Sequence, residues 1–417
     1  MRTLARYTLL VALAWMAGTG TVQAQTPGAA PNGFSIEALV EMALKRAPMV
    51  EAARRRIDVA EGQRIQASLR PNPVMGVDRQ EQLRGADAQT RFSLTVPLDL
   101  FRKDARVAVA GHDVRRADAL ATLERIDRAA AVRIQATQVL AATRQRDVVH
   151  QVAQAARTRL ELLTARVESG AAMPLERDLA DVEWRRTQVE VTQWQGEVDA
   201  AMAELKAVVG WPVHEPLVLA ATLEDAIATL PARPASAPAA AVTARPDVLA
   251  AEAVVARADA QQQLARREGR FDVGVTGGYM WRVLGRDRMQ EVMLGVMVDL
   301  PWRNRQQGAI ASAIAEGLVA RAEMSDARLR AEAEMASAMA RDAAAAAVVE
   351  RYRAGLVDLA AKNLEVVREM WSLGRGTLFD VIEEERRYLD LQSAYTAALR
   401  DLSEARAAVL RAWGVQS

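Results

Sequence analysis

The feature that most constrains this chain is an internal repeat, because the same residue pattern occurs twice, about 200 residues apart. The stretch ALKRAPMVEAARRRI aligns with AVTARPDVLAAEAVV. Three pairs of matching residues keep the same order: Pro48 with Pro246, Gly170 with Gly374, and Gly210 with Gly414. Matches that keep one order at about one spacing indicate a duplication. The chain is therefore expected to fold as two copies of one structural unit.

The repeats are predicted at residues 25–229 and 242–417, and residues 230–241 are predicted to link them. This linker, LPARPASAPAAA, is rich in proline and alanine. Its three prolines cannot continue a helix and favour extended backbone.

The first 24 residues are predicted to be a signal peptide. Arg2 and Arg6 give a positive start, a short apolar run follows, and Val22-Gln23-Ala24 is typical of a cleavage site. A retained N-terminal anchor is the alternative, although the apolar run is short for a membrane span. The chain has no Cys, which excludes disulfides, thiolate metal sites and the acceptor of an N-terminal lipid.

Each repeat contains a predicted β-hairpin, about 74–99 in the first and about 272–300 in the second. Apolar and polar residues alternate in these runs, which is typical of strands with one apolar face, although 74–83 alternates poorly. Ten apolar residues share one phase of the alternation and are predicted to face lipid: Phe92, Leu94, Val96, Val273, Val275, Tyr279, Trp281, Val292, Leu294 and Val296. The hairpin turns are expected at 84–87 and 284–288.

Long helices are predicted around both hairpins, in the same order in each repeat. Their expected ranges are 48–69, 102–168 and 174–208, then 246–267, 304–372 and 377–412. The segments 102–168 and 304–372 contain no Pro, and each would extend on the order of 100 Å as one helix, too long for a compact globule. Within 377–412, apolar residues follow the three-four spacing of coiled-coil packing.

The predicted strands are long enough to cross a bilayer at a tilt, which takes about 9–11 residues. Four strands alone leave two open edges, which a hydrocarbon environment does not tolerate, and membrane barrels begin at about eight strands. Hairpins in a membrane would therefore require at least two copies of the chain. A small soluble sheet that caps a helical bundle is the alternative.

Composition and motifs predict no enzyme, cofactor or metal site. The formal charge is +1 and the 54 basic residues are mixed with 53 acidic ones, which argues against a nucleic-acid partner. The three histidines are widely separated, and no nucleophile–base pair or phosphate loop is present. Gly274, Gly277 and Gly278 lie inside an alternating strand, where they are expected to relieve crowding in a curved wall.

Six motifs occur in order along the chain: FSIEALVEMALKRAPMVEAA, QASLRPNP, ARPDVLAAEA, DLPWRNRQQGAI, SLGRGTLFDVIEEER and the terminal AWG. This ordered series resembles the TolC-like outer-membrane efflux proteins over nearly the whole mature chain. RPNP and RNRQQG are most similar to the branch that serves heavy-metal resistance-nodulation-division (RND) pumps. The resemblance implies a homotrimer, with a 12-stranded β-barrel in the outer membrane and a 12-helix tube across the periplasm. Several relatives carry a lipid on an N-terminal Cys, and this chain cannot.

The resemblance also implies partners and sites near the ends of the long helices. The expected partners are a periplasmic adaptor, an inner-membrane RND pump and outer-membrane lipid. The turns that contain Gly170, Gly374 and Gly376 are predicted to dock the adaptor, or else to be ordinary tight turns. Asp380 and Glu383 match the family's acidic constriction positions, and Glu176 is their counterpart in the first repeat. The alternative for these acidic residues is a plain helix start, with a capping box from Thr377 to Asp380.

The predicted function is a passive trimeric exit duct of a tripartite efflux system, which exports metal ions or small toxic molecules. A periplasmic coiled-coil adaptor or scaffold without a pore is the alternative. Adaptors usually carry a β-rich domain around one helical hairpin, whereas this sequence repeats its whole unit.

Overall fold

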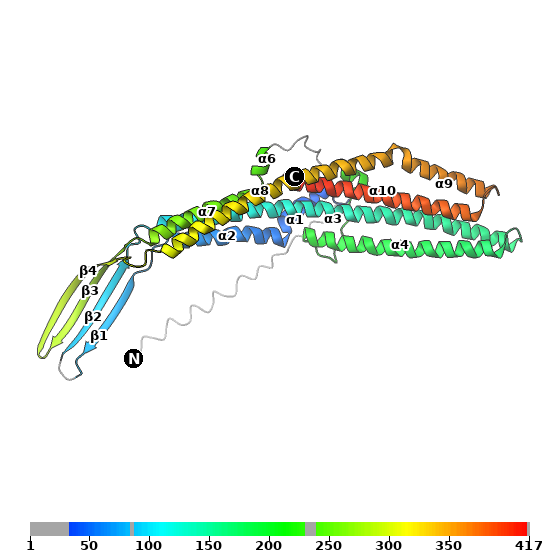
Figure 1. The fold of residues 1–417 in the computed structure, drawn as a ribbon. Helices are drawn as coiled ribbons and strands as arrows, with labels where there is room; N and C mark the ends of the chain where they lie inside the picture. The colour runs from blue at the N-terminus through cyan, green and yellow to red at the C-terminus, as the bar shows by residue number, and fades with distance from the viewer. Residues whose placement is uncertain (1–32, 84–86, 230–238, 415–417) are drawn as a thin grey trace, which may run out of the picture.

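The computed structural model describes residues 33–83, 87–229 and 239–414. Figure 1 shows a long, gently curved rod with a β-sheet at one end and parallel helices along the rest. The predicted signal peptide and most of the linker lie outside the described residues. The mostly helical fold with a small sheet is confirmed. Within the described part, no helix combines the length and the apolar character needed to cross a membrane.

The two predicted repeats place equivalent elements in the same order, except that α5 has no counterpart in the second and η1 has none in the first. The first contains α1 (Ile36–Arg46), α2 (Pro48–Ser68), β1 (Val74–Glu81), β2 (Ala88–Pro97), α3 (Lys103–Glu168), α4 (Pro174–Val209) and α5 (Leu223–Thr229). The second contains α6 (Ala239–Thr243), α7 (Pro246–Glu268), β3 (Asp272–Leu284), β4 (Asp287–Asp299), α8 (Gln307–Arg351), the π-helical turn η1 (Tyr352–Leu356), α9 (Val357–Ser372) and α10 (Leu378–Ala412). Prolines at the first helical position begin α2, α4 and α7, where a missing N–H costs nothing.

Two details differ from the sequence-based expectation, and the strand expected at 74–83 is present. The segment 304–372 is not one helix, because η1 separates α8 from α9. The last residues of the predicted linker, 239–241, begin α6 and are not extended. The poorly alternating run at 74–83 does form a strand, β1, because β2 supplies a complete antiparallel partner.

The four strands form one antiparallel sheet in the order β1-β2-β3-β4. The hairpins of the two repeats meet through β2 and β3, with Val96 opposite Val275 and Phe92 opposite Tyr279. β1 and β4 are the edge strands, so each has one side without a partner among the described strands.

The helices form a single curved layer. Next to the sheet, the packing order is α2, α3, α7 and α8; in the distal half it is α4, α3, α10 and α9. The largest buried cluster lies where these halves meet, and α1 and α5 contribute to it. Its fully buried members include Leu39, Val132, Leu205 and Leu399. Elsewhere, buried alanines let the long helices approach closely.

Candidate functional site

The sheet has one apolar face, and all ten residues predicted to face lipid lie on it. Residues directly opposite each other in a sheet point to the same side. The register gives the rows Val77–Phe92–Tyr279–Val292, Met75–Leu94–Gly277–Leu294 and Val96–Val275–Val296. Val273 and Trp281 also lie on this face, because each is two positions away from Val275 or Tyr279 on β3. The apolar face is open to the surroundings, and Leu294, midway along the edge strand β4, is 84% exposed.

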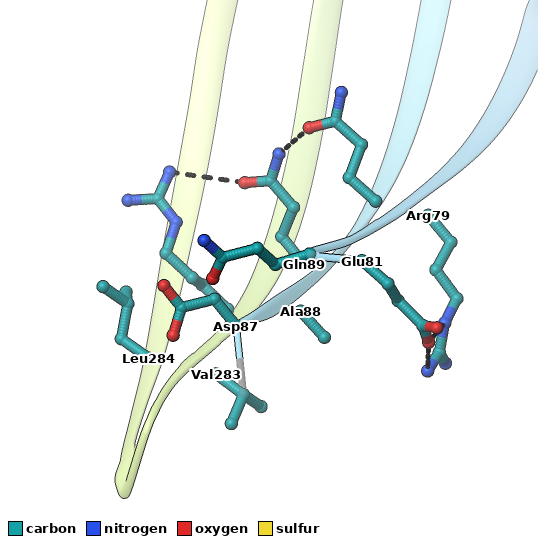
Figure 2. A pocket seen from close by; sticks show the side chains of 10 residues that line it. Arg79, Glu81, Asp87, Ala88, Gln89, Val283 and Leu284 are labelled. Carbon is teal, nitrogen blue, oxygen red and sulfur yellow. Dashed lines mark hydrogen bonds and ion pairs between the residues drawn. The ribbon is translucent and has the colours of Figure 1, made fainter. Parts of the chain in front are cut away.

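The opposite face of the sheet, here called the polar face, carries mostly polar residues and glycines. The Thr95 and Thr276 hydroxyls are hydrogen-bonded at 3.0 Å across β2 and β3, and Asp78 lies opposite Arg91. Toward the hairpin turns, the Gln89 side chain joins Gln80 on β1 to Arg282 on β3. Figure 2 shows how these polar side chains gather around an open pocket beside Asp87 and Leu284.

Aromatic side chains border the apolar face at two heights. Phe101 and Phe271 pack edge to face at 5.4 Å where the sheet joins the helices, and the nearby Trp302 is exposed. Tyr279 and Trp281 lie on β3 toward the hairpin turns. Ten residues separate Phe271 from Trp281, which corresponds to about 25 Å of vertical rise for a strand tilted by about 40°.

The two helix tips farthest from the sheet have the same backbone geometry. Gly170 and Gly374 both have φ of +72°. At each tip the glycine N–H donates to the third carbonyl before it and the next N–H donates to the fifth: Gly170 to Val167, Ala171 to Arg166, Gly374 to Trp371 and Arg375 to Met370. This is the Schellman ending of a helix. Gly376, in contrast, does not have a positive φ.

The three predicted constriction residues all lie in the first turns of α4 and α10. Asp380 accepts hydrogen bonds from the Thr377 backbone N–H at 2.9 Å and from the Thr377 hydroxyl at 2.6 Å, which completes the capping box. These hydrogen bonds hold the pKa of the Asp380 carboxyl below its usual range. Glu383 forms an ion pair with Arg387 at 3.4 Å, and Glu176 is exposed.

A buried charge cluster near the same tips was not predicted from the sequence. Glu385 on α10 is buried and forms ion pairs with Arg159 on α3 and, at 2.7 Å, with Arg368 on α9. Its position carried a signal that could have been used. Glu385 lies three residues before Tyr388, on the three-four seam of this helix, and a carboxylate on a packed seam needs a buried cationic partner.

Comparisons with known proteins agree with this geometry. Residues 39–211, in the first repeat, match the family described as "Outer membrane efflux protein". No curated protein matches the chain in sequence. The fold is similar to CusC, described in terms of transmembrane channel formation, with a TM-score of 0.77 and 15% identity, covering 92% of this chain and 93% of that one.

Two further solved outer membrane proteins have the same fold. MtrE, an outer membrane channel of Neisseria gonorrhoeae in its open state, has a TM-score of 0.75 and 17% identity and covers 92% of this chain and 90% of its own. VceC, an outer membrane protein of Vibrio cholerae, has a TM-score of 0.72 and 19% identity, covering 91% and 96%. The comparisons therefore show a match to the outer membrane efflux protein family over residues 39–211, and the same fold as these solved outer membrane proteins over both predicted repeats.

Proposed function

We propose that three copies of this chain form a passive exit duct that crosses the outer membrane and extends through the periplasm to an adaptor and an RND pump. The observation that carries the proposal is that the sheet and the helical layer both have open edges, which further copies of the chain would complete. The family resemblance supplies the number three.

The strand edges are the first such surface. β1 and β4 each leave a row of backbone N–H and C=O groups without a partner among the described strands. Unpaired backbone groups are not tolerated in hydrocarbon, so a sheet in a membrane has to close on itself. Pairing β4 of one copy with β1 of the next removes every edge, and three copies give 12 strands.

The helix edges are the second surface. In the distal half, α4 and α9 are the outermost helices of the layer. Both expose apolar residues at three-four spacing: Leu175, Leu179, Val182 and Val189 on α4, and Leu356, Leu359, Val366, Met370 and Leu373 along α9 and its flanking residues. These stripes have the spacing of a coiled-coil seam. Packing α9 of one copy on α4 of the next would bury both stripes and close a 12-helix tube.

Membrane fractionation tests this assembly directly. We expect the protein to partition with outer membranes and to migrate as a detergent-resistant trimer. Release by osmotic shock as a monomer would contradict the proposal and favour a pore-free periplasmic scaffold.

The apolar face of the sheet is proposed to contact lipid. Its aromatic borders lie about 25 Å apart, close to the height of the apolar band on outer-membrane barrels. A Leu294→Arg substitution should cost about 2–4 kcal/mol near the middle of the membrane. Gly295→Arg is the matched control, since Gly295 is on the polar face and a Cβ added there meets no atom within 4 Å. Equal insertion of both variants would contradict the lipid assignment.

The helix tips at Gly170 and Gly374, with Gly376 beside the second, are proposed to dock the adaptor. They are the parts of the rod farthest from the sheet, and the Schellman endings present both turns in the same way. Gly374→Val is expected to abolish export while leaving the trimer and its insertion intact. Because Val is strained at a φ of +72°, Ala171→Arg provides an unstrained second test. Normal export by Ala171→Arg, or loss of folding in Gly374→Val, would favour the tight-turn alternative.

Asp380, Glu383 and Glu176 are proposed to form acidic rings that narrow the periplasmic mouth. In the single chain, the capping box lowers the pKa of Asp380. In the trimer, repulsion between the carboxylates of three copies would raise it. The ring and the cap are compatible, because Asp380 serves both with one carboxylate.

Single-channel recordings test the ring. The Asp380→Asn/Glu383→Gln variant should lose cation preference and block by multivalent cations. Asp390→Asn is the control, since Asp390 is an exposed acid farther along α10. If the double variant keeps the wild-type preference, the ring is not present.

A metal-exporting RND pump is the proposed inner-membrane partner, because RPNP and RNRQQG are most similar to the heavy-metal branch. Mild cross-linking followed by identification of the co-purified pump tests this pairing. The duct itself is proposed to carry out no chemical reaction, since its wall would serve only to conduct.

A further inference from the structure

The polar face of β4 carries a regular series of methionines. Met289, Met293 and Met297 occupy every second position on this face, and Glu291, Gly295 and Asp299 occupy the positions between them and at the end. The other face of the same strand carries Val292, Leu294, Val296 and Val298. The three methionines of β4 thus all lie on one side of the strand, whereas the other side is entirely aliphatic from Val292 to Val298.

These methionines are unusual on a surface that otherwise suits water. Their exposed fractions are 48%, 40% and 51%, whereas the inner walls of membrane barrels are normally polar. Packing explains part of the arrangement, because Met293 lies over Gly278 and Met297 lies over Gly274 on the neighbouring strand. It does not explain Met289, which lies opposite Arg282.

The chemistry of the face favours a soft cation over an apolar organic molecule. Sites for organic ligands are usually lined by aromatic groups, and the polar face has none among the described strand residues. A thioether is a soft ligand that selects Cu(I)-like ions. The cationic groups nearby have acidic neighbours, since Arg282 pairs with Glu291 at 3.6 Å and Arg91 lies opposite Asp78.

We propose that Met289, Met293 and Met297 form a ladder of weak thioether sites for soft monovalent cations, Cu(I) and Ag(I), along the inner wall of the channel. The inference rests on the proposed function, because the polar face lines a lumen only if the sheet closes into a barrel. Neighbouring sites lie about 13 Å apart along the strand, since each residue advances about 3.3 Å. Single thioethers at this spacing bind weakly, which suits a path that ions must also leave. Met280 is excluded, because it is buried and its sulfur is already approached by Arg282 at 4.0 Å.

Silver binding to the purified full-length protein tests the ladder. Ag⁺ bound per protomer is measured by equilibrium dialysis, and ¹³C-methyl methionine NMR reports which thioethers respond. We expect Met289→Leu/Met293→Leu/Met297→Leu to lose most of the bound Ag⁺ and to weaken the remaining binding at least tenfold. Met49→Leu/Met75→Leu is the matched control, because these exposed methionines lie on α2 and on the apolar face. Zn²⁺ should bind equally poorly to all three proteins.

Three outcomes would overturn the proposal. These are unchanged Ag⁺ binding in the triple variant, an equal loss in the control, or a triple variant that loses binding of an apolar dye instead of Ag⁺. Trimer migration and conductance are measured on the same samples. Absence of a trimer or of conductance in the wild type would refute the channel proposal itself, whereas normal conductance without methionine-dependent Ag⁺ binding would refute only the ladder.

Discussion

The two longest helical segments of the molecule are equal in length and differ in continuity. α3 runs unbroken for 66 residues, and the corresponding segment of the second repeat also has 66, as 45 in α8, 5 in η1 and 16 in α9. In η1, Gly355 has φ of 113° and ψ of −1°. Gly170 and Gly374 correspond to each other at an offset of 204 residues. At the same offset, the counterpart of Gly355 in α3 is Gln151 (355 − 204). The break is therefore a local change of conformation and not an insertion.

The surroundings of the two segments explain the difference. α3 lies in the middle of the helical layer, with neighbours on both sides along its length. α9 lies at the edge, and Leu364 is its one buried residue. The turn itself lies beside the central core, where Tyr352 packs on Tyr395 at 5.6 Å and Arg353 donates to the Tyr395 hydroxyl at 3.4 Å. The two predicted repeats thus contain long segments of equal length, and we infer that the position in the helical layer determines which of them can bend.

Buried polar contacts join α10 to α3 at two places, one on each side of the break. The hydroxyls of Thr137 and Ser403 lie 2.7 Å apart, and Glu385 pairs with Arg159. Such contacts favour one defined register but contribute less net stability than apolar packing. The tip end of the α9–α10 hairpin is therefore held to α3 partly through a charge cluster that substitution can remove.

The largest effect is expected from Glu385→Ala. It leaves Arg159 buried without its carboxylate, and breaking a buried pair in this way costs about 3–5 kcal/mol. Hydrogen exchange should show faster exchange in α9 and α10, with α4 unchanged. Asp178→Ala, which breaks an exposed pair with Arg177 on α4, should change exchange little.

A double replacement separates charge from packing at this cluster. In Arg159→Met/Glu385→Leu both charges are gone, so most of the lost protection should return. Arg368 stays partly exposed and can remain hydrated. If protection stays low in the double variant, the cluster acts through shape and not through its charges.

Gly355→Ala is expected to have the next largest effect and to make the second repeat resemble the first. A left-handed backbone costs an L-residue about 1–2 kcal/mol, so Ala disfavours the broken conformation. The added Cβ meets no atom within 4 Å, so the backbone alone determines the result. Because the chain has no Cys, spin labels at Asp178→Cys and Glu369→Cys can report the distance between the tips.

We expect Gly355→Ala to change this distance and to slow exchange across Tyr352–Leu356. The matched control is Gln151→Gly in α3, which should weaken that helix by about 1 kcal/mol without breaking it. An unchanged distance in Gly355→Ala would show that the π turn is imposed by tertiary packing and not by glycine.

The sequence predicted the repeating elements well because their signals are local. Two-residue alternation located β2, β3 and β4, and Pro-free runs located α3 and α8. The break at η1 was missed because a single Gly inside a helical run usually remains helical, and only the edge position lets it bend. Glu385 was missed because its partners lie on α3 and α9, so only the tertiary structure brings the three charges together.

The tips provide a third test, in which the two repeats should behave alike. Gly170 and Gly374 have the same φ of +72° and open space around the missing side chain. Gly170→Ala and Gly374→Ala should therefore each cost about 1 kcal/mol. Gly376→Ala should be nearly neutral, because its φ is not positive and the added Cβ would meet Trp371 at an ordinary 3.5 Å. Amide hydrogen exchange in the last turns of α3 and α9 measures the effects of all three substitutions.

The smallest effect is expected where the returning helices begin. α10 begins with the Thr377–Asp380 capping box, whereas α4 begins with Pro174 and has no side-chain cap. Thr377→Ala should cost about 0.5–1 kcal/mol and fray only the first turn of α10.

The two helix starts should also differ in their response to pH. The pKa of Asp380 is lowered in the folded state by its hydrogen bonds from Thr377, so the cap is fully present above the ordinary aspartate pKa. Its contribution is lost as the pH falls through the lowered folded-state value, because a protonated carboxyl is a weaker acceptor for the Thr377 N–H. Exchange of the first turn of α10 should therefore rise in acid relative to the first turn of α4, after correction for the intrinsic pH dependence of exchange. In Thr377→Ala this extra rise should disappear, and an equal response of both helix starts in the wild type would show that the capping box does not determine the stability of this tip.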